Sequence, residues 1–185
     1  MKNFIRTDLK LSLCGLNCSL CTMKLDNYCP GCGGGAGNPG CTIARCSLQH
    51  QSIDYCFQCK EYPCSKYNDI EQYDSFITHR NQLKDMLKAQ AVGIEKYHLE
   101  LNEKAQILRW LLKNYNDGRR KTFFCIAINL LELEDIRMVI EKIKTEIPSN
   151  DMSIKEKALI AVTIFQALAD ERNIILKLYK KPSKK

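Results

Sequence analysis

The chain has 185 residues, which is enough for one ordinary domain or two small ones around a hydrophobic core. Hydrophobic residues make up 45% of it and charged residues 26%, a composition that excludes an intrinsically disordered chain. The net charge is +7, but residues 177–185 carry five lysines and no acid, whereas residues 1–68 carry +3 and residues 69–176 carry −1. Because most of the excess lies in a terminal tail, a folded basic face is not indicated, and we do not expect a nucleic-acid partner.

The sequence contains neither a targeting segment nor a membrane span of the usual length. Residues 1–8 lack the apolar core of a signal peptide. The longest apolar run, 158–165, is interrupted by Thr163 and falls short of the ~18 residues that a membrane helix needs. We therefore expect a cytoplasmic protein without membrane contact. In that reducing compartment, closely spaced cysteines indicate metal binding rather than disulfides.

Cysteine and glycine are concentrated in one part of the chain. Ten of the eleven cysteines and seven of the nine glycines lie within residues 14–64. A segment so poor in large apolar side chains cannot offset its ordering entropy of ~1–2 kcal/mol per residue. A structural zinc site can supply an apparent ~10–16 kcal/mol. The predicted fold is mainly α, with an irregular, metal-stapled, zinc-knuckle-like domain over residues 1–68, a helical bundle over 69–178 and a basic disordered tail over 179–185.

The cysteine spacing is typical of metal sites. A C-x3-C-x2-C triplet is followed by a Cys-Pro-Gly-Cys pair, two single cysteines, and a C-x2-C pair with a further cysteine five residues on. A C-x2-C turn lets two thiolates converge on one ion, and two such pairs complete a tetrahedral zinc site. The candidate ligands are Cys14, Cys18, Cys21, Cys29, Cys32, Cys41, Cys46, Cys56, Cys59 and Cys64.

Ten thiols exceed the eight that two four-cysteine sites use, so the pairing stays open. One arrangement joins Cys18, Cys21, Cys29 and Cys32, and combines Cys56 and Cys59 with two of Cys41, Cys46 and Cys64. A cross-braced arrangement would pair alternate knuckles instead. Cys14 is then spare, buried, or a ligand in place of Cys18. His50 could also be a ligand, although a single histidine in a loop is more often solvated.

Iron is the alternative to zinc. Cys14, Cys18 and Cys21 have the spacing of the radical-SAM triplet, but Leu20 occupies a position that is usually aromatic, and the chain is short for such an enzyme. An iron–sulfur electron carrier would also use four thiolates for each cluster. A third hypothesis is an enzyme that uses a spare thiolate such as Cys14 as nucleophile or as a ligand of an open metal site. The glycine-rich stretch 31–40 lacks a phosphate-loop pattern and is interpreted as a linker.

The rest of the chain is predicted to be helical. Apolar residues recur near a 3.6-residue period over 69–92, 101–115 and 136–147, the last stretch ending before Pro148. Residues 123–131 form an apolar run that fits a buried helix or a strand, and we predict a helix with Cys125 in its core. Ser153 and Glu156 have capping-box spacing and open a final helix that extends towards Tyr179. Four or five helices of this kind would form a small bundle.

The cysteine motifs resemble a known family. Cys14-Gly-Leu-Asn-Cys18-Ser-Leu-Cys21, Cys29-Pro-Gly-Cys32 and Cys56-Phe-Gln-Cys59-Lys-Glu-Tyr-Pro-Cys64 are similar to those of a prokaryotic cysteine-rich group, domain-of-unknown-function family 3795. The resemblance covers residues 11 to 67. It implies a metal-binding cysteine domain without an established reaction, so no catalytic residue can be transferred.

Taken together, the motifs favour a cytosolic protein with two structural zinc ions that acts as a protein-interaction or regulatory module with a protein partner. Neither a catalytic group nor an oligomeric state follows from the sequence, and whether the chain is an enzyme stays open.

Overall fold

The computed structural model describes residues 3–38, 40–50, 53–147 and 152–182, which are mainly helical and contain no strand. The N-terminal part holds only short elements, separated by loops: η1 (Cys18–Leu20), α1 (Thr22–Leu25), α2 (Thr42–Gln49), η2 (Cys56–Gln58) and η3 (Ser65–Tyr67). The C-terminal part holds the longer helices α3 (Gln82–Val92), α4 (Ile94–Asn114), α5 (Lys121–Leu130), α6 (Leu133–Glu146) and α7 (Ile154–Glu171).

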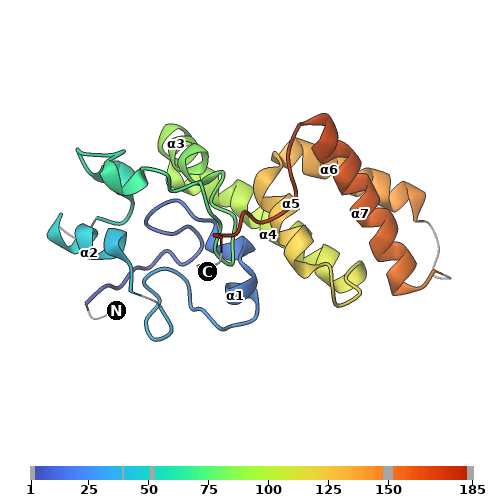
Figure 1. Cartoon of the computed structure of the whole chain (residues 1–185), viewed down its shortest axis with the longest axis horizontal. Coiled ribbons are helices and arrows are strands. Elements are labelled where there is room, and N and C mark those ends of the chain that lie inside the picture. Colours follow the sequence, from blue (N-terminus) through green and yellow to red (C-terminus); the bar gives the residue numbers. More distant parts are fainter. Residues whose placement is uncertain (1–2, 39, 51–52, 148–151, 183–185) are drawn as a thin grey trace.

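The molecule is elongated, with the irregular N-terminal segment at one end and the paired helices α6 and α7 at the other (Figure 1). Helix α4 connects the two ends, since it packs against α3, α5 and the η1 turn. Buried apolar residues of both parts, from Leu11, Leu13 and Leu20 to Phe124 and Phe165, belong to one continuous cluster. The cysteine-rich segment is therefore packed directly on the helices.

Four of the predicted helices are present, and the one expected over 101–115 is the second part of α4, which ends at Asn114. Residues 123–130 lie in α5 and Leu131 caps it; Cys125 is only 5% exposed, so the prediction of a buried helix rather than a strand is confirmed. The Ser153–Glu156 capping box also forms: the Glu156 N–H donates to Ser153 Oγ, and the Ser153 N–H donates to the Glu156 carboxylate. The helix expected over 136–147 is α6. Pro148, expected to stop it, lies outside the described residues.

The prediction of a helix over residues 69–92 is wrong for its first half, because α3 begins only at Gln82. The side chain of Asp74 is completely buried and accepts hydrogen bonds from the His79 N–H at 2.7 Å and the Thr78 hydroxyl at 3.2 Å. A short acidic side chain that bonds nearby main-chain groups competes with helix formation. Residues 69–81 therefore form a loop although their apolar residues have helical spacing.

The final helix is also shorter than predicted, since α7 ends at Glu171 instead of continuing towards Tyr179. The chain then returns to the middle of the molecule (Figure 1). Arg80 donates to the carbonyls of Ile175 at 2.7 Å and Lys177 at 2.8 Å, and Asp74 accepts from the Tyr179 N–H at 2.8 Å. Tyr179, the first residue of the expected disordered tail, is thus hydrogen-bonded to the helical part, whereas residues 183–185 lie outside the described residues.

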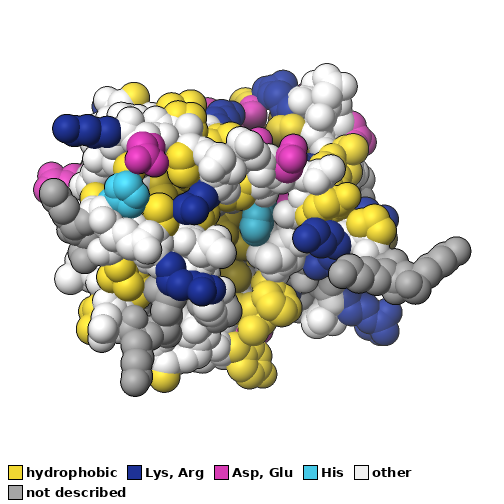
Figure 2. Space-filling model, turned by 60° about the vertical axis from the view of Figure 1, so that its left-hand side comes forward, with side chains coloured by type: hydrophobic (Ala, Val, Ile, Leu, Met, Phe, Trp, Pro, Cys, Tyr) yellow, Lys and Arg dark blue, Asp and Glu magenta, His cyan; other side chains and the backbone are white. Residues whose placement is uncertain are grey.

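Charge is dispersed over the face seen in Figure 2. Lysine and arginine side chains lie apart from one another and alternate with acidic and apolar ones. No continuous basic band crosses the described part of this face. Within the described residues, none of the helices combines the length and the apolar character that crossing a membrane would require.

A buried polar network joins the cysteine-rich segment to three helices. The Asn17 side chain is 2% exposed and donates to Asp85 on α3 at 2.8 Å and to Asn129 on α5 at 3.2 Å. Its carbonyl oxygen accepts from the Tyr97 hydroxyl on α4 at 2.9 Å. Burial raises the pKa of Asp85 to about 6, although the charge of Lys104 and the hydrogen bond from Asn17 act in the opposite direction.

This network gives the unfolding free energy a specific pH dependence. Because the folded-state pKa of Asp85 lies above its ordinary value of 3.8, the folded protein binds the extra proton between pH 4 and pH 6. The contribution of this group to stability is therefore lost as the pH rises through about 6, by on the order of 3 kcal/mol. Asp85→Asn keeps the hydrogen-bond acceptor but cannot titrate. We expect wild-type stability to fall relative to this variant as the pH rises from 4 to 6.5, measured by denaturant unfolding. Parallel pH profiles of the two proteins would contradict this assignment.

Candidate metal centre

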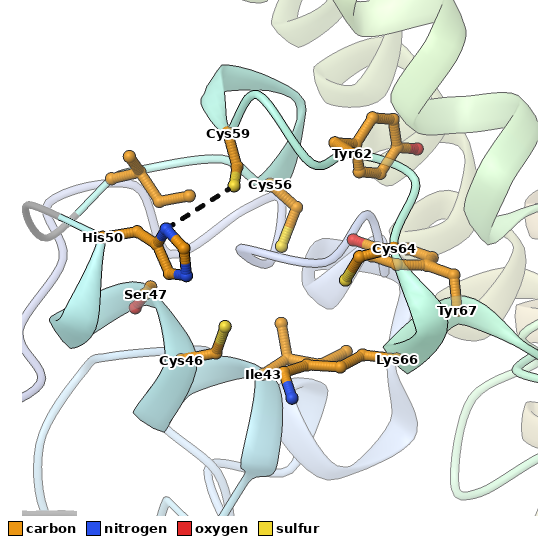
Figure 3. A pocket seen from close by; sticks show the side chains of 11 residues that line it. Ile43, Cys46, Ser47, His50, Cys56, Cys59, Tyr62, Cys64, Lys66 and Tyr67 are labelled. Atoms are coloured by element: carbon orange, nitrogen blue, oxygen red, sulfur yellow. Dashed lines mark hydrogen bonds between the residues drawn. The ribbon is translucent and has the colours of Figure 1, made fainter.

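All eleven cysteines are free thiols. Eight of the ten predicted ligands fall into two groups of four, which are numbered by their order along the chain. The second cysteine group consists of Cys46 on α2, Cys56 and Cys59 at η2, and Cys64 before η3. Their sulfurs face one shared cavity of about 30 Å³ (Figure 3). The predicted Cys56–Cys59 pair thus shares its cavity with Cys46 and Cys64, two of the three cysteines among which the sequence could not choose its partners.

Local turns place these thiols. The Cys56 N–H donates to the Leu13 carbonyl at 2.9 Å, which fixes η2 against the N-terminal loop. The Cys59 N–H donates to the Cys56 carbonyl at 3.0 Å and closes the turn, so both side chains reach the same cavity. Gln58 holds the start of the turn by accepting from the Tyr55 N–H at 3.0 Å. Turns with C-x2-C spacing are common in zinc sites.

His50 lies beside this group. Its Nδ1 is 3.8 Å from the Cys59 sulfur, and the ring lines the same cavity (Figure 3). The histidine that the sequence left as a possible ligand is therefore next to the thiols rather than in a separate loop. Tyr67 also lines the cavity (Figure 3). Burial raises the pKa of Cys56 to about 12, and a hydrogen bond from the Tyr67 hydroxyl lowers it in part.

The first cysteine group consists of Cys14, Cys18, Cys32 and Cys41. Neighbouring thiols of this group raise the pKa values of Cys14, Cys18 and Cys32. Burial raises the pKa of Cys14 to about 11; the Ser12 hydroxyl lowers it, and Cys32 and Cys41 raise it further. Burial likewise raises the pKa of Cys18 to about 12, with Cys32, Cys14 and Cys21 adding to the shift. Burial therefore favours the protonated form of the Cys14 and Cys18 thiols.

The remaining two candidates lie near α1. Cys21 is the residue before this helix and is near enough to Cys18 to contribute to its raised pKa. Cys29 follows the helix, and its N–H donates to the Met23 carbonyl at 3.1 Å. Among the described residues, no three cysteine, histidine, aspartate or glutamate side chains converge closely enough to hold an ion as they stand.

Sequence reasoning missed Arg6. Its side chain is 2% exposed and donates to the carbonyls of Asp54 at 3.0 Å, Leu11 at 3.0 Å and Cys32 at 3.3 Å. The guanidinium lies over the Tyr55 ring, 5.2 Å from its centre. Nothing in the sequence around Arg6 distinguishes it from a solvated terminal arginine.

Asp8, His98 and Tyr55 form a further polar cluster beside Arg6. The Asp8 carboxylate accepts from the Tyr55 hydroxyl at 2.8 Å and lies 3.1 Å from His98 Nε2 on α4. Burial by itself would raise the pKa of Asp8, but hydrogen bonds from the Lys10 N–H and Tyr55, together with the His98 charge, lower it overall. This cluster is a second polar link between the N-terminal loop and the helices.

No family model, curated protein or solved structure matches this chain. The resemblance of its cysteine motifs to family 3795 therefore remains an expectation.

The glycine of the Cys14-Gly-Leu-Asn-Cys18 motif has a steric role that can be tested. Gly15 has φ +100, and a Cβ there would lie 2.6 Å from the Gln82 carbonyl oxygen and would overlap the Met86 side chain of α3. Gly35 has a similar φ of +103 but open space around it. We expect Gly15→Ala to lower the unfolding free energy by about 3 kcal/mol or more, and Gly35→Ala by only about 1 kcal/mol. Denaturant unfolding of the two variants makes the comparison, and equal losses would show that the close approach to α3 does not matter.

Proposed function

We propose that this chain is a metal-binding protein that holds two structural zinc ions through cysteine thiolates, one in each cysteine group. The observation that carries the proposal is the second cysteine group, whose four sulfurs, coming from three separate elements, face one small cavity (Figure 3). Four thiolates are a donor set that suits tetrahedral zinc. The free state of all eleven cysteines agrees with this use, since none is consumed in a disulfide.

The proposed role of the metal is structural. Residues 14–64 carry few large apolar side chains, yet they must present Leu20 and Asn17 in fixed positions to the helices. An ion that cross-links α2, η2 and the loop at Cys64 supplies the order that the small core cannot. The segment stabilised in this way is proposed to bind a protein partner. In its favour, Tyr28 beside α1 is 71% exposed and Phe76, whose carbonyl contacts α1, is 63% exposed.

The alternative of a spare-thiolate enzyme receives less support. A nucleophilic cysteine needs a lowered pKa and access to solvent. Burial instead raises the pKa of Cys14 to about 11. An iron–sulfur protein would use the same thiols as the zinc protein, so the distinction between the two rests on the metal itself.

Metal analysis tests the proposal directly. Protein purified untagged without oxygen should contain two zinc ions per chain and lack visible charge-transfer absorption. Cys46→Ser and Cys64→Ser should each reduce the zinc content to one, because each removes a ligand of the second cysteine group. Cys125→Ser is the matched control, since this buried thiol lies in α5 and should leave two ions. If the purified protein contains iron and sulfide instead of zinc, the function is redox rather than structural. Metal-free wild-type protein would refute the proposal as a whole.

A further inference from the structure

The C-terminal segment, residues 174–181, lies against the loop of residues 69–81 (Figure 1). Every second side chain in the first half of this segment packs on the hydrophobic core, namely those of Ile174, Leu176 and Leu178. The intervening Ile175 is 57% exposed and Tyr179 is 38% exposed. Burial that alternates with a period of two is the pattern of an extended peptide that presents one apolar face.

The loop holds this segment by its main chain. The Arg80 guanidinium donates to the carbonyls of Ile175 at 2.7 Å and Lys177 at 2.8 Å. Asp74 binds Tyr179 twice, since the Asp74 N–H donates to the Tyr179 carbonyl at 2.7 Å and its carboxylate accepts from the Tyr179 N–H at 2.8 Å. Nearly every residue type offers these main-chain groups, so the four bonds fit any extended segment. Grooves that bind extended peptides use the same combination of main-chain bonds and alternate apolar side chains.

The groups that hold the segment are themselves fixed by other parts of the molecule. The Asp74 side chain is completely buried, and its carboxylate lies 3.9 Å from Arg80 Nε. The neighbouring Asn81 side chain donates to the carbonyls of Asn129 at 3.1 Å and Leu130 at 3.4 Å, at the end of α5. We therefore expect the groove formed by residues 69–81 and the end of α5 to keep its shape when the segment leaves.

The C-terminal segment fills this groove only in part. An open cavity of about 280 Å³ is lined by Ile174 and Ile175 of the segment together with Asn81 and Leu130 of the groove. The bonds from Arg80 to the segment are exposed to solvent, and contacts of this kind open at a low cost in free energy. Another segment with a larger apolar side chain at this point would keep the main-chain bonds and also fill the cavity.

We propose that residues 69–81 and the end of α5 form a peptide-binding groove, which the C-terminal segment occupies as an autoinhibitory contact. The partner that displaces it is a protein segment in an extended conformation with apolar side chains at alternate positions. Phe76, the 63% exposed aromatic residue beside α1, belongs to the same loop. The inference rests on the partner-binding part of the proposed function and not on the metal, because the residues that carry it lie outside both cysteine groups.

The test uses a fluorescein-labelled synthetic peptide with the sequence of residues 172–182 as the probe, and fluorescence anisotropy as the measurement. Tyr179→Pro in the full chain removes the N–H that binds Asp74 and weakens the hold on the chain's own segment. This variant should bind the probe at least tenfold more tightly than wild type, because its own segment competes less. Adding Arg80→Met should weaken that binding at least tenfold. Adding Arg119→Met instead, at an exposed arginine before α5, is the matched control and should leave it unchanged.

The buried face of the probe should decide its affinity. A probe that carries Ile174→Ser, Leu176→Ser and Leu178→Ser should not bind. In wild-type protein, hydrogen exchange should be at least tenfold faster for the Tyr179 N–H than for the N–H groups in the middle of α5, and this measurement needs no variant to fold.

Four results would overturn the inference: equal binding of the probe to wild type and Tyr179→Pro, equal binding of the serine probe, exchange of the Tyr179 N–H at the rate of α5, or a dimer of Tyr179→Pro in light scattering, which would make a second copy the occupant. Zinc analysis of the same samples separates this inference from the metal proposal. Protein with two zinc ions that fails to bind the probe overturns the groove alone, whereas metal-free protein that binds the probe overturns the zinc proposal alone.

Discussion

The amide of Asn17 is the contact on which the arrangement of the two parts depends. It lies between Cys14 and Cys18, and its two polar ends are bonded to side chains of α3, α4 and α5. In a buried site each of these partners would lose its hydrogen bond if the loop moved, and an unsatisfied buried polar group costs about 1–3 kcal/mol. The loop that carries two candidate ligands therefore cannot shift without disturbing three helices. Gly15 adds a steric condition to the same loop, because only glycine permits its close approach to α3.

This coupling gives the proposed metal centres a consequence beyond their own segment. Leu11, Leu13 and Leu20 are fully or almost fully buried and continue the core of the helices into the cysteine-rich part. An ion that fixed the positions of the thiols would also restrict the motion of these apolar residues and of Asn17. A structural ion would thus stabilise the packing of α3–α5 as well as the loops, which fits a role in presenting a surface rather than in chemistry at the metal.

The electrostatics of the N-terminal part are arranged around thiols that burial keeps protonated. The pKa values of Cys14, Cys18 and Cys56 are all raised by burial, while Arg6, Ser12 and Tyr67 act in the opposite direction at individual sulfurs. Two of these opposing groups, Arg6 and Tyr67, are distant from their targets in the sequence. Arg6 is far along the chain from Cys32, and Tyr67 is eleven positions from Cys56. Only the folded loops bring these donors to the sulfurs.

The sequence by itself determined the elements whose causes are local. The apolar period of 136–147, the Ser153 capping box and the concentration of ten cysteines within 14–64 are all readable without tertiary information, and the corresponding helices form. The tertiary structure decided whatever depends on distant partners. Asp74 replaces the expected helix at 69–81 with a loop because it binds Thr78, His79 and the returning chain at Tyr179. The grouping of Cys46 and Cys64 with the Cys56 pair, and the burial of Arg6 under the Cys32 loop, likewise depend on how the loops pack against one another. Spacing can identify thiols as ligands, but which thiols meet depends on how the loops pack against the helices.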